Sequence, residues 1–248
     1  MSDDFPAATA HDPPTEVLPD VWMVRGTLVR DTTTFTRNMV LLRHGGELTV
    51  INTVRLDDGG ERRLEQLGRV AHLVKLGAFH GLDDPYYRSR YPDARFWAPP
   101  GSAHKRGIHH DDDLTEQSAP PVPGLGVFSF RNTRLPEAAL HLPVGGGTLI
   151  TCDAATAVRD LEGTRGMERI LTAENGFLRP VTIGLMWRNG MARDPGPSLL
   201  PDFQRLLELD FGNLLTAHGP PVLGNARDEL RETVRIVFGV RRWPARVQ

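Results

Sequence analysis

The stretch that most constrains the fold is residues 70–87, VAHLVKLGAFHGLDDPYY, where an apolar run stops at His80 and an acidic loop follows. This pattern predicts a buried strand that delivers a histidine and two carboxylates, Asp83 and Asp84, to the rim of a sheet. Side chains that bind a metal or move a proton often sit at such strand ends, because the scaffold is rigid while the loop leaves them exposed. The chain is therefore expected to hold a sheet whose strand ends carry chemistry.

Composition limits the function classes. The 248 residues carry a formal net charge of −2, so no overall basic field draws the chain to nucleic acid or to an anionic membrane. No apolar run approaches the roughly 20 residues of a membrane span, and the N-terminus lacks the pattern of a secretory signal. The single cysteine, Cys152, excludes an internal disulfide and a thiolate-rich metal site. A reducing cytoplasm is the simplest compartment, and any metal must rely on His, Asp or Glu.

The domain organisation is predicted to be simple. Residues 1–15 are rich in Pro, Ala, Asp and Thr and cannot bury much, so they are expected to form a mobile N-terminal arm. Residues 16–248 show no linker and are expected to form one domain.

The first half of this domain reads as a sheet. The β-like runs at residues 21–29, 36–43 and 47–53 predict an antiparallel meander. A charged helix at 57–68, capped by Asp57 or Asp58, connects the meander to a strand at 70–76, which is expected to lie in the same sheet. A short helix from Pro85 to about Tyr91 and a strand at 94–98 follow, and residues 101–124 are loop-like.

The second half adds further strands and closing helices. Strands are expected at 126–132, 138–142, 148–152 and 213–217, and helices at 198–210 and at 225–240, the latter capped by Asn225. Residues 161–179 are expected to be partly helical, and 181–186 to be a strand or a helix. Asp153 and His218 directly follow two of the strands, so three strand ends carry acids or histidines.

This order resembles the metallo-β-lactamase-like superfamily, whose first motif reads His-x-His-x-Asp-His. Residues 80–85 read His-Gly-Leu-Asp-Asp-Pro, so His80 and Asp84 match the first His and the Asp of that motif. TCDA around Asp153 resembles the Thr-Gly-Asp phrase of the family's bridging aspartate, and AHGPP around His218 resembles the Gly-His-Gly phrase of its last histidine. The family's middle histidine has no clear match, because His141 lies inside a β-like run.

The resemblance implies an α/β fold, a four-layer αββα sandwich of two mixed β-sheets flanked by helices, with the site on loops at one edge. Leu82 and Pro85 stand where the family has histidines and cannot coordinate a metal. The ligands that the resemblance leaves are Asp84, Asp153 and His218, with His80 as a fourth ligand or general base. His80 and Asp84 are the catalytic candidates. This mixed oxygen and nitrogen set suits one Zn²⁺, Mn²⁺ or Fe²⁺ ion.

Two functions remain open. The first is a divergent hydrolase that cleaves ester, amide or phosphoester bonds of a small-molecule substrate with a single metal and activated water. The alternative is a metal-free, non-catalytic relative that binds a small molecule or a protein partner in the same cleft. In that case Asp84 would cap a helix, Asp153 would cap a turn, and His218 would bond a backbone carbonyl. Redox chemistry with iron is a weaker third reading, because few imidazoles remain.

Other polar clusters have simpler explanations. The run HHDDD at residues 109–113 is typical of a solvated charge cluster rather than a cation site. Cys152 lies beside a carboxylate at the end of an apolar strand, which favours a buried and inert thiol. The glycines at 145–147 are not a phosphate loop, because no Lys-Ser/Thr phrase follows them.

Overall fold

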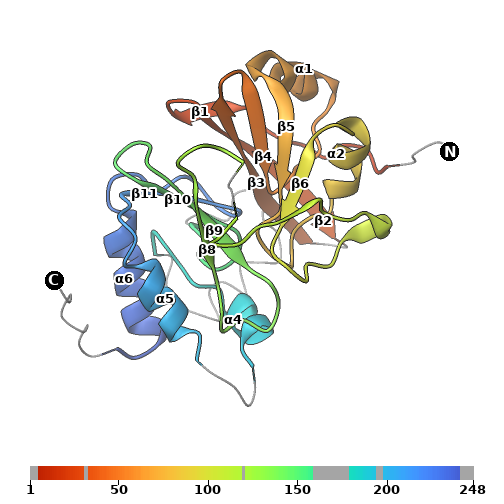
Figure 1. Cartoon of the computed structure of the whole chain (residues 1–248). Coiled ribbons are helices and arrows are strands. Elements are labelled where there is room, and N and C mark those ends of the chain that lie inside the picture. The colour runs from red at the N-terminus through yellow and green to blue at the C-terminus, as the bar shows by residue number, and fades with distance from the viewer. Residues whose placement is uncertain (1–4, 31–32, 119–120, 159–178, 194–197, 241–248) are drawn as a thin grey trace.

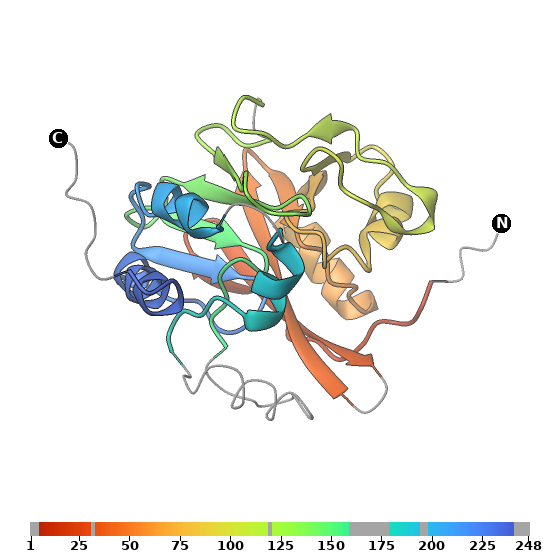
Figure 2. The same ribbon diagram turned by 90° about the horizontal axis from the view of Figure 1, so that it is seen from below.

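The computed structural model describes residues 5–30, 33–118, 121–158, 179–193 and 198–240. Two β-sheets pack face to face, with helices on the outer side of each (Figure 1). Figure 2 shows the same layers from below, with α5 and α6 on one outer side and α1 and α2 on the other. The architecture is the four-layer αββα sandwich expected from the sequence.

The larger sheet has seven strands in the order β1-β2-β3-β4-β5-β6-β7. Neighbouring strands from β1 to β4 run antiparallel, which confirms the predicted meander. From β4 to β7 they run parallel, so the strand expected at 70–76 does lie in the same sheet. The strands are β1 (Thr15–Leu18), β2 (Val21–Arg30), β3 (Thr33–His44), β4 (Glu47–Ile51), β5 (Arg69–Val74), β6 (Arg95–Ala98) and β7 (Asp112–Asp113).

The smaller sheet has four strands in the order β11-β10-β9-β8. Strands β10 and β11 are parallel, whereas β8, β9 and β10 are antiparallel, so both sheets are mixed. These strands are β8 (Gly126–Ser129), β9 (Ala138–Leu142), β10 (Thr148–Thr151) and β11 (Asn213–Thr216).

The helices predicted at 57–68, 85–91, 198–210 and 225–240 are all present, although α5 and α6 end four and three residues earlier than expected. Asp57 is the N-cap of α1, and its side chain accepts a hydrogen bond from Gly60 N at 2.7 Å. Asn225 occupies the N-cap position of α6 but makes no side-chain cap bond. The helices are α1 (Asp58–Leu67), α2 (Asp84–Arg90), the 3₁₀ turn η1 (Lys105–Gly107), α4 (Leu185–Met191), α5 (Leu200–Leu206) and α6 (Ala226–Val237).

The segments expected at 161–179 and at 181–186 have different outcomes. The helical content expected at 161–179 falls almost wholly outside the described residues. For 181–186, Thr182 forms an isolated bridge with Thr156 and helix starts only at Leu185.

Three apolar clusters hold the layers together, because burial of apolar surface is the main favourable contribution to folding. One lies between the sheets, a second under α1 and α2, and a third under α4, α5 and α6. The cluster between the sheets includes Val21, Val40, Ile51, Val74, Leu140, Ile150 and Leu215. Each sheet is thus covered on both faces.

Part of the expected N-terminal arm contacts the larger sheet. Thr27 N donates to Ala10 O at 2.9 Å, and Asp12 N donates to Arg25 O at 2.7 Å. His11 Nε2 accepts a hydrogen bond from Asp57 N at 2.9 Å. Residues 10–12 are thereby attached to β2 and to the start of α1. The single domain predicted for residues 16–248 stays a prediction.

None of the helices in the described ranges is long and apolar enough to span a membrane.

Candidate metal site

Three of the four predicted ligand residues meet at one place. His80 follows β5, Asp153 follows β10 and His218 follows β11, so three strand ends from both sheets converge. The Nε2 atoms of His80 and His218 lie 3.1 Å apart. Asp153 Oδ1 lies 3.4 Å from the first and 3.1 Å from the second. Within the described residues, this is the one group of His, Cys, Asp or Glu that could hold a metal ion.

His218 is held in place by strand β3 of the opposite sheet. Its Nδ1 bonds the carbonyl oxygen of Thr36. The side-chain amide of Asn38 donates to Thr216 O at 2.9 Å and to Gly219 O at 2.6 Å. The Asn38 N–H donates to Ala217 O at 2.7 Å. The loop that carries His218 is therefore fixed on both sides of the histidine.

The carbonyl partner determines the His218 tautomer. A carbonyl oxygen only accepts, so Nδ1 must carry the proton, and in the neutral ring Nε2 then presents a lone pair to Asp153 and His80. A neutral His80 can direct one N–H into this group, but the lone pairs of His218 Nε2 and Asp153 Oδ1 still face each other. A positive charge is needed at the centre, either a second proton or a metal ion.

The charges of this group shift the pKa values of Asp153 and His218. Burial alone would raise the pKa of Asp153, but the imidazoles of His80 and His218 hold it well below its usual range. Burial disfavours the charged form of His218, yet the Asp153 carboxylate and the Thr36 carbonyl outweigh it and raise the His218 pKa. Without a metal, these pKa shifts favour an ionised Asp153 beside a His218 that carries a proton on both ring nitrogens.

The spacing of the three atoms fits one metal ion. Zinc lies about 2.0–2.2 Å from nitrogen and oxygen ligands in tetrahedral sites, so two ligand atoms on one ion are about 3.3 Å apart. The observed separations are 3.1, 3.1 and 3.4 Å. The second nitrogen of His218 already has its backbone partner, as is usual for metal-binding histidines.

The fourth predicted ligand, Asp84, lies outside this group. It belongs to the first turn of α2 and is 2% exposed. Its Oδ1 accepts a hydrogen bond from the Thr53 hydroxyl at 2.7 Å. Burial raises the pKa of Asp84, opposed by the Thr53 hydrogen bond and the nearby Lys75 ammonium. The role of Asp84 as a ligand and catalytic residue stays a prediction without support from its position.

Sequence reasoning missed several buried charged residues near the site, among them Lys75 and Glu137. Lys75 is 3% exposed and Glu137 is 2% exposed. Glu137 Oε1 accepts a hydrogen bond from Ala154 N at 3.2 Å, directly after Asp153. Burial and the Asp153 charge raise the pKa of Glu137 well above its usual value. The available signal was a lone charged residue beside an apolar run, in VAHLVKL and in LPEAALHL.

Other candidate residues lie in structural contacts. His141 on β9 bonds Asp210 O at 2.7 Å and is not part of the metal group. Cys152 is buried, as predicted, and its pKa is raised well above the usual value by burial and then by Asp153, which disfavours a reactive thiolate.

The acidic run at 109–113 is more structured than expected. Asp112–Asp113 form β7, and Asp111 Oδ2 accepts a hydrogen bond from Phe96 N at 2.8 Å. His110 bridges His104 and Asp113 through its two ring nitrogens, at 2.9 and 3.0 Å. The run is a continuation of the sheet rather than a freely solvated cluster.

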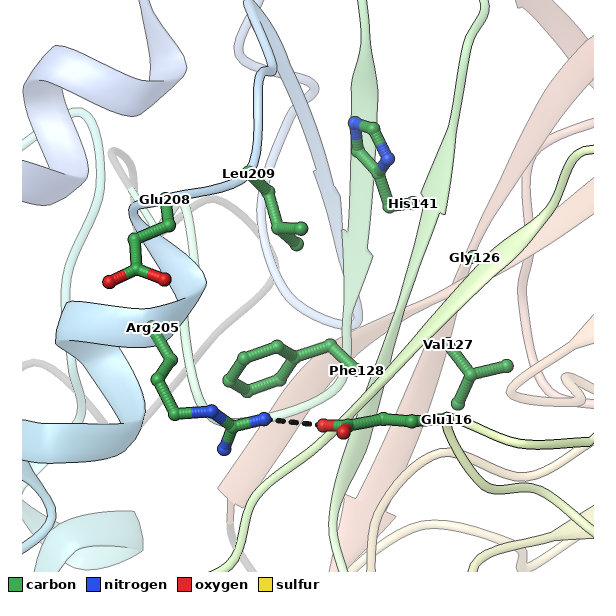
Figure 3. Close-up of a pocket in the computed structure, with 8 residues that line it drawn as sticks. All are labelled: Glu116, Gly126, Val127, Phe128, His141, Arg205, Glu208 and Leu209. Atoms are coloured by element: carbon green, nitrogen blue, oxygen red, sulfur yellow. Dashed lines mark hydrogen bonds and ion pairs between the residues drawn. The ribbon is translucent and has the colours of Figure 1, made fainter. Parts of the chain in front are cut away.

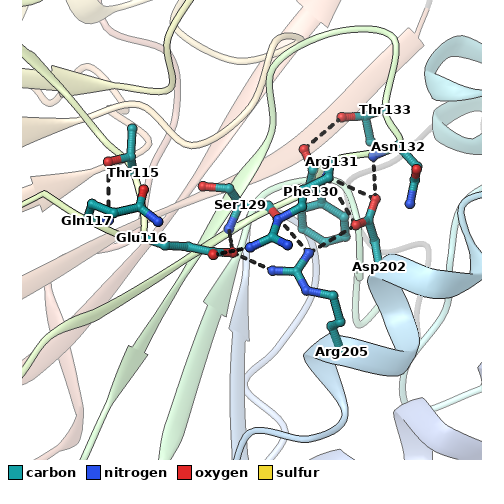
Figure 4. Close-up of polar contacts among 10 residues, drawn as sticks. All are labelled: Thr115, Glu116, Gln117, Ser129, Phe130, Arg131, Asn132, Thr133, Asp202 and Arg205. Carbon is teal, nitrogen blue, oxygen red and sulfur yellow. Dashed lines mark hydrogen bonds and ion pairs between the residues drawn. The ribbon is translucent and has the colours of Figure 1, made fainter.

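A groove of about 350 Å³ lies between the C-terminal end of α5 and strands β8 and β9 (Figure 3). Arg205 stacks over Phe128, 4.6 Å from the ring centroid, and forms an ion pair with Glu116. Figure 4 shows that Asp202 of α5 accepts the N–H groups of Arg131 and Asn132. These contacts, together with the hydrogen bond from Arg205 to Ser129 O, attach α5 to β8 and to the residues that follow it.

The four-layer arrangement is that of solved metallo-β-lactamase structures. No family model and no curated protein matches the sequence. Solved structures do match. VMB-1 at pH 5.5 gives a TM-score of 0.64 at 11% identity, over 94% of this chain and 99% of that chain. The mono-zinc form of FIM-1 from Pseudomonas aeruginosa gives 0.59 at 12%, over 91% and 96%.

A metallo-β-lactamase from Hirschia baltica gives a TM-score of 0.59 at 13% identity, over 91% of this chain and 98% of that chain. The resemblance seen in the sequence is thus confirmed at the level of the fold, as that of a divergent chain. Identities this low show the shared architecture and not a shared activity.

Proposed function

We propose that this protein is a hydrolase that uses one divalent metal ion, held by His80, Asp153 and His218, to cleave an ester, amide or phosphoester bond of a small-molecule substrate. The observation that carries the proposal is the convergence of three ligand atoms at 3.1–3.4 Å, with the remaining nitrogen of His218 bonded to a backbone carbonyl. The candidate ions are Zn²⁺, Mn²⁺ and Fe²⁺, and the lone buried Cys152 favours the reducing cytoplasm as the compartment.

Each residue has a defined part in this proposal. A bound ion would act as a Lewis acid and lower the pKa of a water molecule at an open position. Asp153 contributes the negative charge that favours a cation over a neutral ligand. The Thr36 carbonyl orients the His218 ring and fixes its tautomer. Glu137 bonds the N–H of Ala154 and so restrains the turn that presents Asp153.

The shared fold supports the proposal in one further respect. The structure of FIM-1 is described as a mono-zinc form, so this architecture accommodates one ion in that protein. The lack of histidines at Leu82 and Pro85 also favours a single ion here, because fewer imidazoles are present than two ions require.

The test is metal binding together with hydrolysis. Protein purified without a polyhistidine tag is stripped with a chelator and reloaded separately with Zn²⁺, Mn²⁺ or Fe²⁺. We expect about one equivalent of at least one metal, and metal-dependent cleavage of at least one chromogenic ester, amide or phosphodiester. Asp153→Asn should lose both properties, whereas the matched control Asp210→Asn, whose side chain is 99% exposed, should keep both.

Less than about a tenth of an equivalent of every metal after reloading would rule out the hydrolase and favour the metal-free binding protein. Full metal occupancy with no cleavage of any of the three bond types would contradict the catalytic part alone.

A further inference from the structure

A buried lysine, Lys75, lies against Gly81 in the loop that carries His80. Lys75 follows β5 and is 3% exposed. Its ammonium donates a hydrogen bond to Ala103 O at 2.7 Å. An ammonium group removed from water is costly unless a negative charge lies nearby, because the interior solvates it poorly. The structure must therefore supply a counter-ion.

The available carboxylate is that of Asp84, which is 2% exposed. Its Oδ1 is bonded to the Thr53 hydroxyl, whereas its Oδ2 is buried and has no hydrogen-bond partner in the described part of the chain. A buried carboxylate oxygen in this condition is stabilised by a nearby positive charge.

Gly81 brings the two groups together. It has φ of +100°, and a Cβ there would lie 2.4 Å from Asp84 Oδ2 and 3.0 Å from Lys75 Nζ. Both charged atoms thus lie against the same side of one glycine, immediately after His80. Opposite charges attract more strongly in a poorly hydrated interior than in water.

We propose that Lys75 is the permanent counter-ion of Asp84, that their pairing keeps Asp84 out of the metal site, and that the pair fixes the turn that positions His80. The metal part of this inference rests on the proposed function, whereas the pairing itself does not. It assigns Lys75 and Asp84 as positioning residues and leaves His80, Asp153 and His218 as the metal ligands among the described residues.

The first experiment compares metal affinities. Zn²⁺ is titrated in competition with a chromophoric chelator into the wild type, Asp84→Asn and Asp153→Asn. Asn keeps the shape of Asp84 and an oxygen for Thr53. We expect Asp84→Asn to weaken binding less than about tenfold, and Asp153→Asn to weaken it more than about 100-fold. Equal losses in the two variants would overturn the proposal, because Asp84 would then matter to the metal as much as a ligand does.

The second experiment measures the pairing in metal-free protein. Folding equilibrium constants are obtained by urea unfolding for Lys75→Met, Asp84→Asn and the double variant. Lys75→Met leaves a buried carboxylate alone and should lower the constant about 100-fold or more, and adding Asp84→Asn should restore at least about tenfold. The control is Lys105→Met, because Lys105 is the other lysine and is exposed.

Additive effects of the two substitutions would overturn the pairing. If Lys75→Met fails to fold, a double variant that folds supports the pairing, and a double variant that also fails overturns it. A wild type that binds no metal would remove the proposed function, but the cycle in metal-free protein would still decide whether Lys75 and Asp84 are paired.

Discussion

At the scale of single residues, the site is defined by one hydrogen bond and one charge. Thr36 O requires the proton of His218 on Nδ1, which leaves Nε2 facing the Asp153 carboxylate. In the metal-free protein a second proton on His218 satisfies this contact, and a metal ion would replace that proton. Metal binding is therefore expected to release protons.

This proton gives the metal-free protein a defined pH dependence. Asp153 has a lowered folded pKa, so its stabilisation is present above the ordinary aspartate pKa of about 4 and is lost as the pH falls through the folded value. His218 has a raised folded pKa, so its contribution is complete below the ordinary histidine value of about 6.5 and is lost as the pH rises through the folded value.

We therefore expect the free energy of unfolding of the metal-free protein to fall as the pH rises above about 6.5, and this fall to be smaller in Asp153→Asn. Urea unfolding between pH 5 and 9, with Asp210→Asn as the matched control, measures it. The same slope in the wild type and in Asp153→Asn would contradict the assigned coupling.

The convergence of His80, Asp153 and His218 could be predicted from the sequence, because each follows an apolar β-like run and strand ends at one edge of a sandwich lie close together. The sequence could not place Asp84. Whether that carboxylate faces a metal or Lys75 depends on how the 81–84 turn folds back on β5, and residue types alone do not encode that turn. The positive φ of Gly81 is the decisive feature, and glycine is also common in ordinary turns.

At the scale of elements, the hydrogen bonds between β3 and the end of β11 link the two sheets beside the metal site. The two strands belong to different sheets, and Asn38 connects them through three hydrogen bonds to residues 216, 217 and 219. Gly219 must approach closely, because a Cβ there would lie 2.1 Å from Ala157 O. These contacts of Asn38, and not β11 alone, determine where His218 lies.

Replacing Asn38 by Ala should therefore affect both stability and metal binding. One buried and one partly buried carbonyl group lose the Asn38 donor, so the free energy of unfolding should fall by about 1–3 kcal/mol. His218 loses its support, and Zn²⁺ affinity should fall about 10–100-fold. Chemical unfolding and competitive Zn²⁺ titration provide the two values.

Asn213 offers a matched control. It is also buried, and its amide donates to Gly145 O at 2.8 Å, at the opposite end of β11 from His218. Asn213→Ala should be similarly destabilised but keep its Zn²⁺ affinity within about threefold, because no site residue moves. Equal losses of affinity in the two variants would argue against a specific role for Asn38.

Most elements were predictable because the strands alternate or form short apolar runs, Asp57 caps α1, and prolines lie in the first turns of α2 and α5. Two strands that were not predicted are β1, at Thr15–Leu18, and β7. Asp112 and Asp113 carry no β-propensity, and they are in the sheet because β6 offers them a parallel edge. Such pairing over a long connection is a tertiary effect that local sequence does not show.

At the scale of the whole molecule, the order of elements was more informative than any motif. The first motif retains only His80 and Asp84, yet strand ends at His80, Asp153 and His218 lead to an αββα sandwich. Solved structures share that fold at 11–13% identity. Many different apolar residues can fill the same layer of a core, so a fold tolerates more sequence change than a set of metal ligands does. The substrate depends on a few side chains, which the order of elements does not specify.

The most direct test of the central claim is the position of a metal in a crystal. Crystals of the untagged protein are soaked with Zn²⁺, and anomalous diffraction is measured on both sides of the zinc absorption edge. We predict a single strong peak about 2.0–2.2 Å from the Nε2 atoms of His80 and His218 and from Asp153 Oδ1, with Asp84 uncoordinated. No peak at these three residues, or a peak coordinated by Asp84, would contradict the account.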